Sequence, residues 1–209
     1  ALAARTASIV VDYRSGAILQ ADNADVAVYP ASLTKAMTLY MLFEQLRDKK
    51  LSLDTKLKVS RHAAAMPPSR LGLRAGSSIR VGDAIMALIT KSANDVAVVV
   101  AEALGGSESG FARKMTQRAR QLGMSRTTFS NASGLPHARQ RMETLSDFVP
   151  LAGFLASGTL PLAETDFEDL KADKEDILEA LQFVLWRLEV RRDWKRDSIY
   201  SDIKGIADA

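Results

Sequence analysis

Charge is distributed unevenly along this chain, and the unevenness limits how it can fold. Residues 1–141 carry 20 Lys and Arg against 10 Asp and Glu, a net charge of +10, whereas residues 142–209 carry 8 against 15, a net charge of −7. The net charge of +3 for all 209 residues is the balance of these two values. Such a reversal suggests two parts of different character. We expect one region over residues 1–141 and a divergent, acidic, mainly helical tail over residues 142–209.

The composition excludes several kinds of functional site. The chain has no Cys, so disulfides, thiolate nucleophiles and Cys-based metal sites are ruled out. Its two histidines, His62 and His137, lack a nearby pattern of Asp or Glu, so we expect surface or loop residues and no metal site. The small net charge does not indicate nucleic acid as a partner. The longest uncharged stretch, residues 148–163, is too short for a membrane span, which needs roughly 20 residues.

The spacing of apolar residues predicts a hairpin followed by a mainly helical region. Two short apolar runs on either side of Arg14-Ser15-Gly16 indicate the hairpin. Residues 164–196 are typical of a long helix with an acidic start and a basic end, which suits a packing or partner helix and allows self-association. The other expected elements are strands at 7–13, 17–20 and 56–60 and helices at 30–50, 81–90, 95–104 and 109–122.

Ser32 and Lys35 form a Ser-x-x-Lys motif at the start of the first long helix. The three-residue spacing places both side chains on one face, so the lysine amine can reach the hydroxyl. A lysine that loses its proton through burial can act as a general base and make the serine a nucleophile. For the tetrapeptide alone, a helix N-cap Ser beside a solvated Lys is the favoured interpretation.

A second polar group follows about sixty residues later. Ser92 and Asn94 are two residues apart in Ser92-Ala93-Asn94-Asp95, between two expected helices. A hydroxyl and a carboxamide placed in this way can pass a proton and hold a substrate amide. The competing interpretation is that either side chain only caps the next helix.

In their wider context these motifs resemble a known family. Tyr29-Pro30-Ala31-Ser32-Leu33-Thr34-Lys35 is similar to the active-site signature of the serine D-alanyl-D-alanine carboxypeptidases, the low-molecular-mass penicillin-binding proteins. Ser92-Ala93-Asn94-Asp95 resembles their second motif, and Ser133-Gly134-Leu135-Pro136 extends the similarity. The resemblance covers residues 6–141 and implies an α+β fold like that of β-lactamases and DD-peptidases, with a helical cluster and a small, incomplete antiparallel sheet. The pattern of residues 164–196 adds a helical C-terminal extension.

The resemblance also implies a chemistry. Ser32 would attack the carbonyl between the two terminal D-Ala residues of a peptidoglycan stem peptide, and Lys35 would be the base. Ser92 would relay a proton to the leaving D-Ala, and Asn94 would hold the substrate backbone or Lys35. β-Lactams would acylate Ser32, no cofactor or metal would be needed, and the protein would act in the periplasm or the extracytoplasmic envelope.

The family's third motif, Lys-Thr-Gly on a strand beside the nucleophile, is absent from this sequence. The nearest late match is Ser157-Gly158-Thr159, which has Ala156 in place of the cation. An alternative is therefore a catalytically impaired relative that binds a partner through its C-terminal helix. β-Lactamase activity is a third option that the sequence supports less, because Glu143 is the only acid shortly downstream of Asn94 and lacks the pattern expected of a deacylation base.

Overall fold

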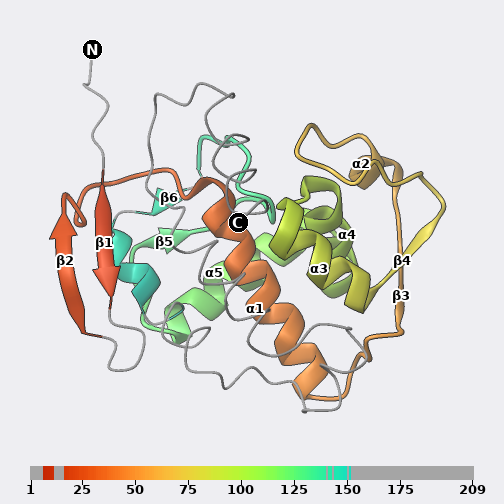
Figure 1. Ribbon diagram of the computed structural model, residues 1–209, viewed down its shortest axis with the longest axis horizontal. Coiled ribbons are helices and arrows are strands. Elements are labelled where there is room, and N and C mark those ends of the chain that lie inside the picture. Colours follow the sequence, from red (N-terminus) through yellow and green to blue (C-terminus); the bar gives the residue numbers. More distant parts are fainter. Residues whose placement is uncertain (1–6, 12–16, 140, 143, 150, 152–209) are drawn as a thin grey trace, which may run out of the picture.

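The computed structural model describes residues 7–11, 17–139, 141–142, 144–149 and 151 (Figure 1). Helices dominate this part of the chain, and three two-stranded antiparallel sheets lie around them. The expected α+β class is confirmed. Among the described residues no helix has the length and apolar character needed to span a membrane.

Helix α1 (Thr34–Arg47) is central to the fold. Nine of its first ten residues are buried, because helices pack against it from several directions. It contacts α3 (Val81–Lys91), α4 (Asn94–Gly105) and α5 (Glu108–Gln121). The start of α1 is thereby held rigidly, together with the short 3₁₀ helix η1 (Ala31–Leu33) that precedes it.

The other helices begin and end where local chemistry allows. Ser60 caps the short helix α2 (Arg61–Ala64), and Ser107 caps α5, each by accepting a backbone N–H with its hydroxyl. Helix α4 ends at Gly106, which has the left-handed φ of 73° that favours glycine. Valine and alanine fill α4, and every residue from Asn94 to Ala101 is buried. This helix is therefore the second core element beside α1.

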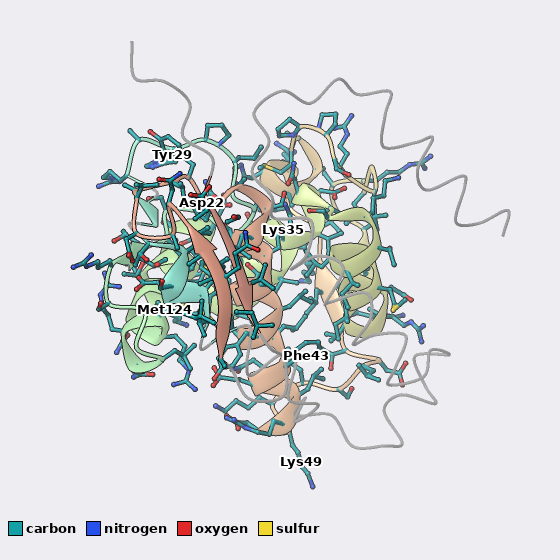
Figure 2. The ribbon with its side chains drawn as sticks, turned by 60° about the vertical axis from the view of Figure 1, so that its left-hand side comes forward. Asp22, Tyr29, Lys35, Phe43, Lys49 and Met124 are labelled. Atoms are coloured by element: carbon teal, nitrogen blue, oxygen red, sulfur yellow. The ribbon has the colours of Figure 1, made fainter. Side chains whose placement is uncertain are left out.

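The strands are short and lie at the periphery. Strands β1 (Ser8–Val11) and β2 (Ile18–Asp22) form the N-terminal hairpin, which lies on the opposite side of α1 from α3 and α4 (Figures 1 and 2). All five residues of β2 are exposed. The second sheet pairs β3 (Lys56–Lys58) with β4 (Ser78–Arg80), and the third pairs β5 (Thr127–Thr128) with β6 (Arg141–Met142).

Packing continues beyond Arg141. The 3₁₀ helix η2 (Leu145–Phe148) buries both of its end residues, and Leu151 is fully buried. Thr144 Oγ1 donates to the carbonyl of Ala24 at 2.8 Å, and Asp147 accepts the backbone N–H of Arg126 at 2.8 Å. The described residues that follow Arg141 therefore pack against the basic region.

The expected hairpin and the four expected helices before residue 130 are present, with ends shifted by a few residues. Helix α2 and strands β4, β5 and β6 were not expected, because segments of two to four residues are too short to show a periodic pattern. The long helix expected at residues 164–196 lies outside the described residues, so it stays a prediction.

Candidate active site

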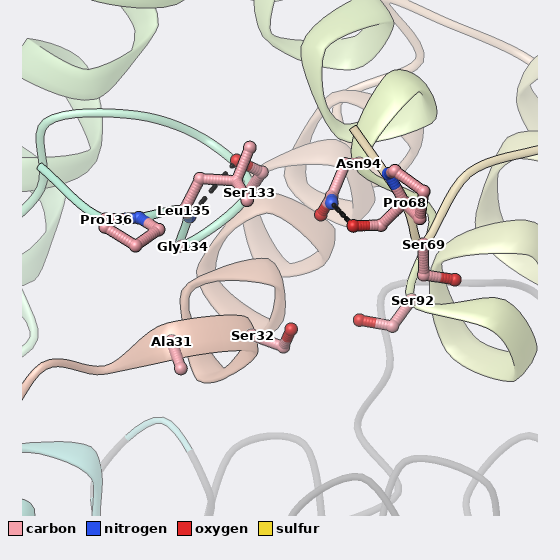
Figure 3. Close-up of a pocket in the computed structure, with 10 residues that line it drawn as sticks. All are labelled: Ala31, Ser32, Pro68, Ser69, Ser92, Asn94, Ser133, Gly134, Leu135 and Pro136. Carbon is pink, nitrogen blue, oxygen red and sulfur yellow. Dashed lines mark hydrogen bonds between the residues drawn. The ribbon is translucent and has the colours of Figure 1, made fainter. Parts of the chain in front are cut away.

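The N-terminus of α1 opens into a pocket of about 230 Å³. Three loops complete it: the turn between α3 and α4, the loop after α2, and the loop before β6 (Figure 3). Its lining residues are mostly small or polar: Ala31, Ser32, Pro68, Ser69, Ser92, Asn94, Ser133, Gly134, Leu135 and Pro136. Three of the four residues expected at the site, Ser32, Ser92 and Asn94, are therefore brought to one pocket.

Ser32 is presented to this pocket by a constrained turn. Ala31, just before it, has a φ of 44°, a left-handed conformation that costs a residue with a Cβ about 1–2 kcal/mol. The next residue, Leu33, is buried and anchors the turn, whereas Ser32 itself is exposed. The hydroxyl is thus accessible while the backbone that carries it is fixed.

Lys35, the fourth expected residue, lies behind Ser32. It is only 2% exposed, and its Nζ lies 3.3 Å from Ser32 Oγ. The same Nζ donates to the carbonyl of Ser133 at 2.7 Å. Burial lowers the pKa of Lys35 from 10.5 to about 7, because the charged ammonium loses its hydration. About half of the lysine side chains are therefore neutral near pH 7 and can accept the proton of Ser32.

Ser92 lies on the other side of the pocket. It is the C-cap of α3 and has a left-handed φ of 52°. Figure 3 shows its hydroxyl directed towards the side of the pocket where Ser32 lies. The Ser92 hydroxyl forms no hydrogen bond with any residue that the structure describes, so it can bind a substrate or pass a proton.

Asn94 and Asp95 fix the loop that follows α2. The Asn94 side-chain nitrogen donates to the carbonyls of Pro67 and Pro68 at 3.1 Å each. Figure 3 shows the bond to Pro68. The carboxylate of Asp95, which is fully buried, accepts the backbone N–H groups of residues 71, 72, 73 and 96 at 2.9–3.1 Å. The sequence indicated Asn94 as a substrate contact but gave no role to Asp95, which holds one wall of the pocket.

Ser133 and Gly134 form the opposite wall, and sequence reasoning assigned them no role in the site. The Ser133 carbonyl accepts from Lys35, and Gly134 has a φ of 83°. A Cβ at Gly134 would lie 1.6 Å from the carbonyl oxygen of Ala31, so only glycine fits. The signal that could have found them was the Ser-Gly pair within the resembling segment at 133–136.

The two histidines lie outside the pocket lining. His62 is exposed, as expected, but its Nε2 lies 2.9 Å from a carboxylate oxygen of Glu108, an acid partner that sequence distance concealed. His137 is exposed too. The structure shows no cluster of metal-ligating side chains within its described residues. The segments Arg14-Ser15-Gly16 and Ser157-Gly158-Thr159 include residues outside the described ranges.

Comparison with known proteins shows which proteins this chain resembles. The family profile for D-alanyl-D-alanine carboxypeptidases matches residues 1–176. The carboxypeptidase DacF of Bacillus subtilis is 34% identical over 128 residues, which are 61% of this chain and 33% of DacF. The crystal structure of penicillin binding protein 5 from Haemophilus influenzae superimposes with a TM-score of 0.68 at 30% identity, covering 74% of this chain and 45% of that one.

A second group of relatives matches a shorter stretch. The glutamate–tRNA ligase of Saccharophagus degradans is 50% identical over 74 residues, which are 35% of this chain and 15% of the ligase. The chain spans about a third of the length of DacF and of the other curated carboxypeptidases that it matches, and a smaller share of the ligase.

The family profile covers most of the chain, and the motifs that carry the resemblance surround the pocket. The chain therefore belongs to the D-alanyl-D-alanine carboxypeptidase family.

Proposed function

We propose that this protein is a serine-type D-Ala-D-Ala carboxypeptidase in which Ser32 is the nucleophile and Lys35 its general base. The observation that carries the proposal is the buried Lys35 amine, 3.3 Å from Ser32 Oγ, with a pKa lowered to about 7. A general base is most effective when its pKa lies near the working pH. Ser32 and Lys35 thus meet both the geometric and the electrostatic requirement for acyl transfer.

The reaction has two steps. Lys35 takes the proton of Ser32 as its oxygen bonds to the carbonyl carbon of the penultimate D-Ala, and the backbone N–H of Ser32 serves as one oxyanion donor. The C–N bond then breaks as the Ser92 hydroxyl delivers a proton to the leaving D-Ala, and the Lys35 ammonium returns a proton to Ser92. Water attacks the ester in the second step, which releases the shortened peptide and restores the Ser32 hydroxyl. Asn94 Oδ1, which accepts no hydrogen bond within the described residues, is available to a substrate N–H.

The substrates proposed here are peptidoglycan stem peptides that end in D-Ala-D-Ala. β-Lactams present a reactive carbonyl to the same serine and are proposed as covalent inhibitors. Both the family profile and the relatives named above support this substrate class. Peptidoglycan lies outside the cytoplasmic membrane, so the envelope is the proposed location.

Covalent labelling tests the nucleophile directly. We expect a fluorescent penicillin to label the wild-type protein and not Ser32→Ala, with intact mass showing one equivalent added. Ser69→Ala is the matched control, because Ser69 also lines the pocket but donates its hydroxyl to the carbonyl of Lys91 at 2.7 Å. Labelling of Ser32→Ala at the wild-type rate would refute the nucleophile. Release of D-Ala from a D-Ala-D-Ala peptide tests the complete reaction.

We propose further that the acidic tail has a different ancestry from the peptidase region. The peptidase motifs occupy residues 29–136, with 28 residues before them and 73 after them, so a segment of about 74 residues with a different origin can lie only at the C-terminal end of this chain. That position coincides with the reversal of charge after Arg141. The family profile extends to residue 176, so the proposed division into residues 1–141 and 142–209 rests on the reversal of charge and on the length of the ligase match. The stretch represents 15% of the ligase, so we assign it no aminoacylation activity.

Truncation and solution size test the role of the tail. A chain ending at Leu151 keeps every described residue of the pocket and should be labelled by penicillin at the full-chain rate, provided that circular dichroism shows it folded. Slower labelling of the folded truncation would show that the tail contributes to acyl transfer. Light scattering of both chains tests whether residues 164–196 mediate self-association.

A further inference from the structure

A short segment, Asn131–Gly134, supports the start of α1 and is here called the ledge. The ledge contacts α1 and the turn before it in three places. Its Ser133 carbonyl accepts from Lys35 at 2.7 Å, and its Ala132 carbonyl accepts from Thr38 at 2.9 Å. Its Gly134 lies against the backbone of Ala31. A displacement of the ledge would therefore remove a hydrogen-bond acceptor from the lysine amine.

Glu108 contacts the ledge at Ala132. It lies in the first turn of α5, and its side chain is 15% exposed. One carboxylate oxygen accepts the backbone N–H of Ala132 at 3.2 Å, and the other lies 2.9 Å from His62 Nε2. The carboxylate thus connects α2 to the ledge residue that precedes Ser133.

We propose that Glu108 is a positioning residue for Lys35: by holding Ala132, it keeps the Ser133 carbonyl against the lysine amine. This inference rests on the proposed function, because it concerns the base of that reaction. Glu108 does not touch the pocket lining directly, and it acts through the ledge.

A displacement of the ledge would change the protonation of Lys35, because the amine is now shielded from water. Within the described residues its amine has two hydrogen-bond partners, Ser32 Oγ and the Ser133 carbonyl, and burial is the cause that lowers its pKa. No charged side chain contributes to this shift. If the ledge moves away, water reaches the amine, the ammonium form becomes more stable, and a smaller fraction of Lys35 is neutral at pH 7.

Two substitutions of Glu108 distinguish the effect of its side-chain length from the effect of its charge. Glu108→Asp keeps the negative charge at the start of α5 but shortens the side chain by one methylene, which withdraws the acceptor from Ala132. Glu108→Gln removes the charge but keeps an acceptor at the original reach. We expect Glu108→Asp to raise the midpoint of the pH profile of penicillin acylation by about one unit, which makes acylation about tenfold slower near pH 6. Glu108→Gln should keep the wild-type midpoint.

Glu102→Asp is the matched control. Glu102 also contacts the α2 region, since it accepts from Ser60 Oγ at 3.0 Å, but it has no recorded contact with the ledge within the described residues. It should leave the midpoint unchanged. A general loss of stability would lower the amount of active protein without moving the midpoint.

A second readout distinguishes failure of this inference from failure of the proposed function. NMR titration of the Lys35 side-chain ε-methylene, assigned with Lys35→Arg, reports the lysine pKa without catalysis. If penicillin does not label the wild type, the proposed function fails, while the NMR comparison still tests Glu108. Equal Lys35 pKa values in the wild type and Glu108→Asp would overturn the positioning role, as would a shift in Glu108→Gln as large as that in Glu108→Asp.

Discussion

Gly134 lies directly against the carbonyl of Ala31, so the ledge and the turn that carries the nucleophile fit together without room for a side chain. A Cβ at Gly134 would be 1.6 Å from the Ala31 oxygen and 3.0 Å from the backbone nitrogen of Ser32. That nitrogen carries the N–H assigned here to the oxyanion. The position of the proposed oxyanion donor therefore depends on a residue about one hundred positions later in the chain.

Gly134→Ala should slow acylation by about 10²–10³, and only part of that effect should arise from lost stability. The added methyl must displace the Ala31-Ser32 peptide bond, and a misplaced oxyanion donor costs about 10²–10³ in rate. Gly123→Ala is the control: Gly123 has the same φ of 83°, but a Cβ there would meet nothing within 4 Å. Each substitution should cost about 1–2 kcal/mol for the left-handed backbone. Penicillin labelling and thermal unfolding of both variants measure the difference, and equal labelling would disprove the coupling.

The long elements were predictable from sequence because their signals are local. Helices α3 and α5 carry regular apolar spacing, and in the sequence two short apolar runs on either side of Arg14-Ser15-Gly16 predict the hairpin. The pairing of Ser32 with Lys35 was predictable as well, because a three-residue step on a helix is a local distance. Ser92 and Asn94 stood out as a hydroxyl and a carboxamide two residues apart, and the resemblance supplied their roles.

The contacts of the ledge with Lys35 and of Asp95 with residues 71–73 were not predictable, because each joins residues that lie far apart in the sequence. Lys35 and the Ser133 carbonyl are 98 residues apart, and the acceptor is a backbone atom that any residue type could supply. In the sequence, Asp95 is only the last residue of the Ser92-Ala93-Asn94-Asp95 motif. In the structure, its carboxylate accepts three backbone N–H groups from a loop more than twenty residues earlier in the chain. Such contacts have no periodicity for a sequence pattern to reveal.

The pH dependence of acylation should follow the ionisation of Lys35. Burial lowers the pKa of this lysine to about 7, and only the neutral amine can accept the Ser32 proton. The rate of penicillin labelling should therefore rise tenfold for each pH unit up to about pH 6, bend near pH 7 and become constant above pH 8. A rate that stays constant between pH 5 and pH 8 would contradict Lys35 as the base.

Replacing Lys35 should make the protein more stable as it becomes inactive. Since the pKa of Lys35 is about 7 in the folded state and 10.5 ordinarily, the unfolded chain binds more protons between these values. Stability from this residue therefore falls by about 1.4 kcal/mol for each pH unit as the pH drops from 10.5 to 7, and is constant below. Lys35→Met should raise the free energy of unfolding at pH 6 by a few kcal/mol and remove this dependence.

The matched control for that substitution is Lys58→Met, because Lys58 is exposed on β3. It should change the free energy of unfolding by less than about 0.5 kcal/mol at either pH. Urea unfolding at pH 6 and pH 9 provides the comparison. A Lys35→Met protein less stable than the wild type at pH 6 would show that burying the amine carries no net cost.

Asp95→Asn should loosen the pocket wall and weaken substrate binding more than it slows the chemical step. The amide leaves at least one of four backbone N–H groups without its buried acceptor, which costs about 1–3 kcal/mol. Asp83→Asn is the control, because Asp83 pairs with Arg80 at an exposed site in the first turn of α3. Hydrogen exchange at residues 71–73 should accelerate in Asp95→Asn alone. Unchanged exchange there would show that the loop does not depend on this carboxylate.

Ser92→Ala should slow acylation by about 10²–10⁴, the usual contribution of a positioned proton donor. The Ser92 hydroxyl lines the pocket and has no hydrogen-bond partner among the described residues, so its removal breaks no contact of the resting protein. The melting temperature should therefore stay within about 1 °C of wild type, in contrast to Asp95→Asn, where loss of activity and loss of stability occur together. Stopped-flow labelling separates the binding constant from the acylation rate. If Ser92→Ala changes only the binding constant, the hydroxyl holds the substrate and the leaving group takes its proton from elsewhere.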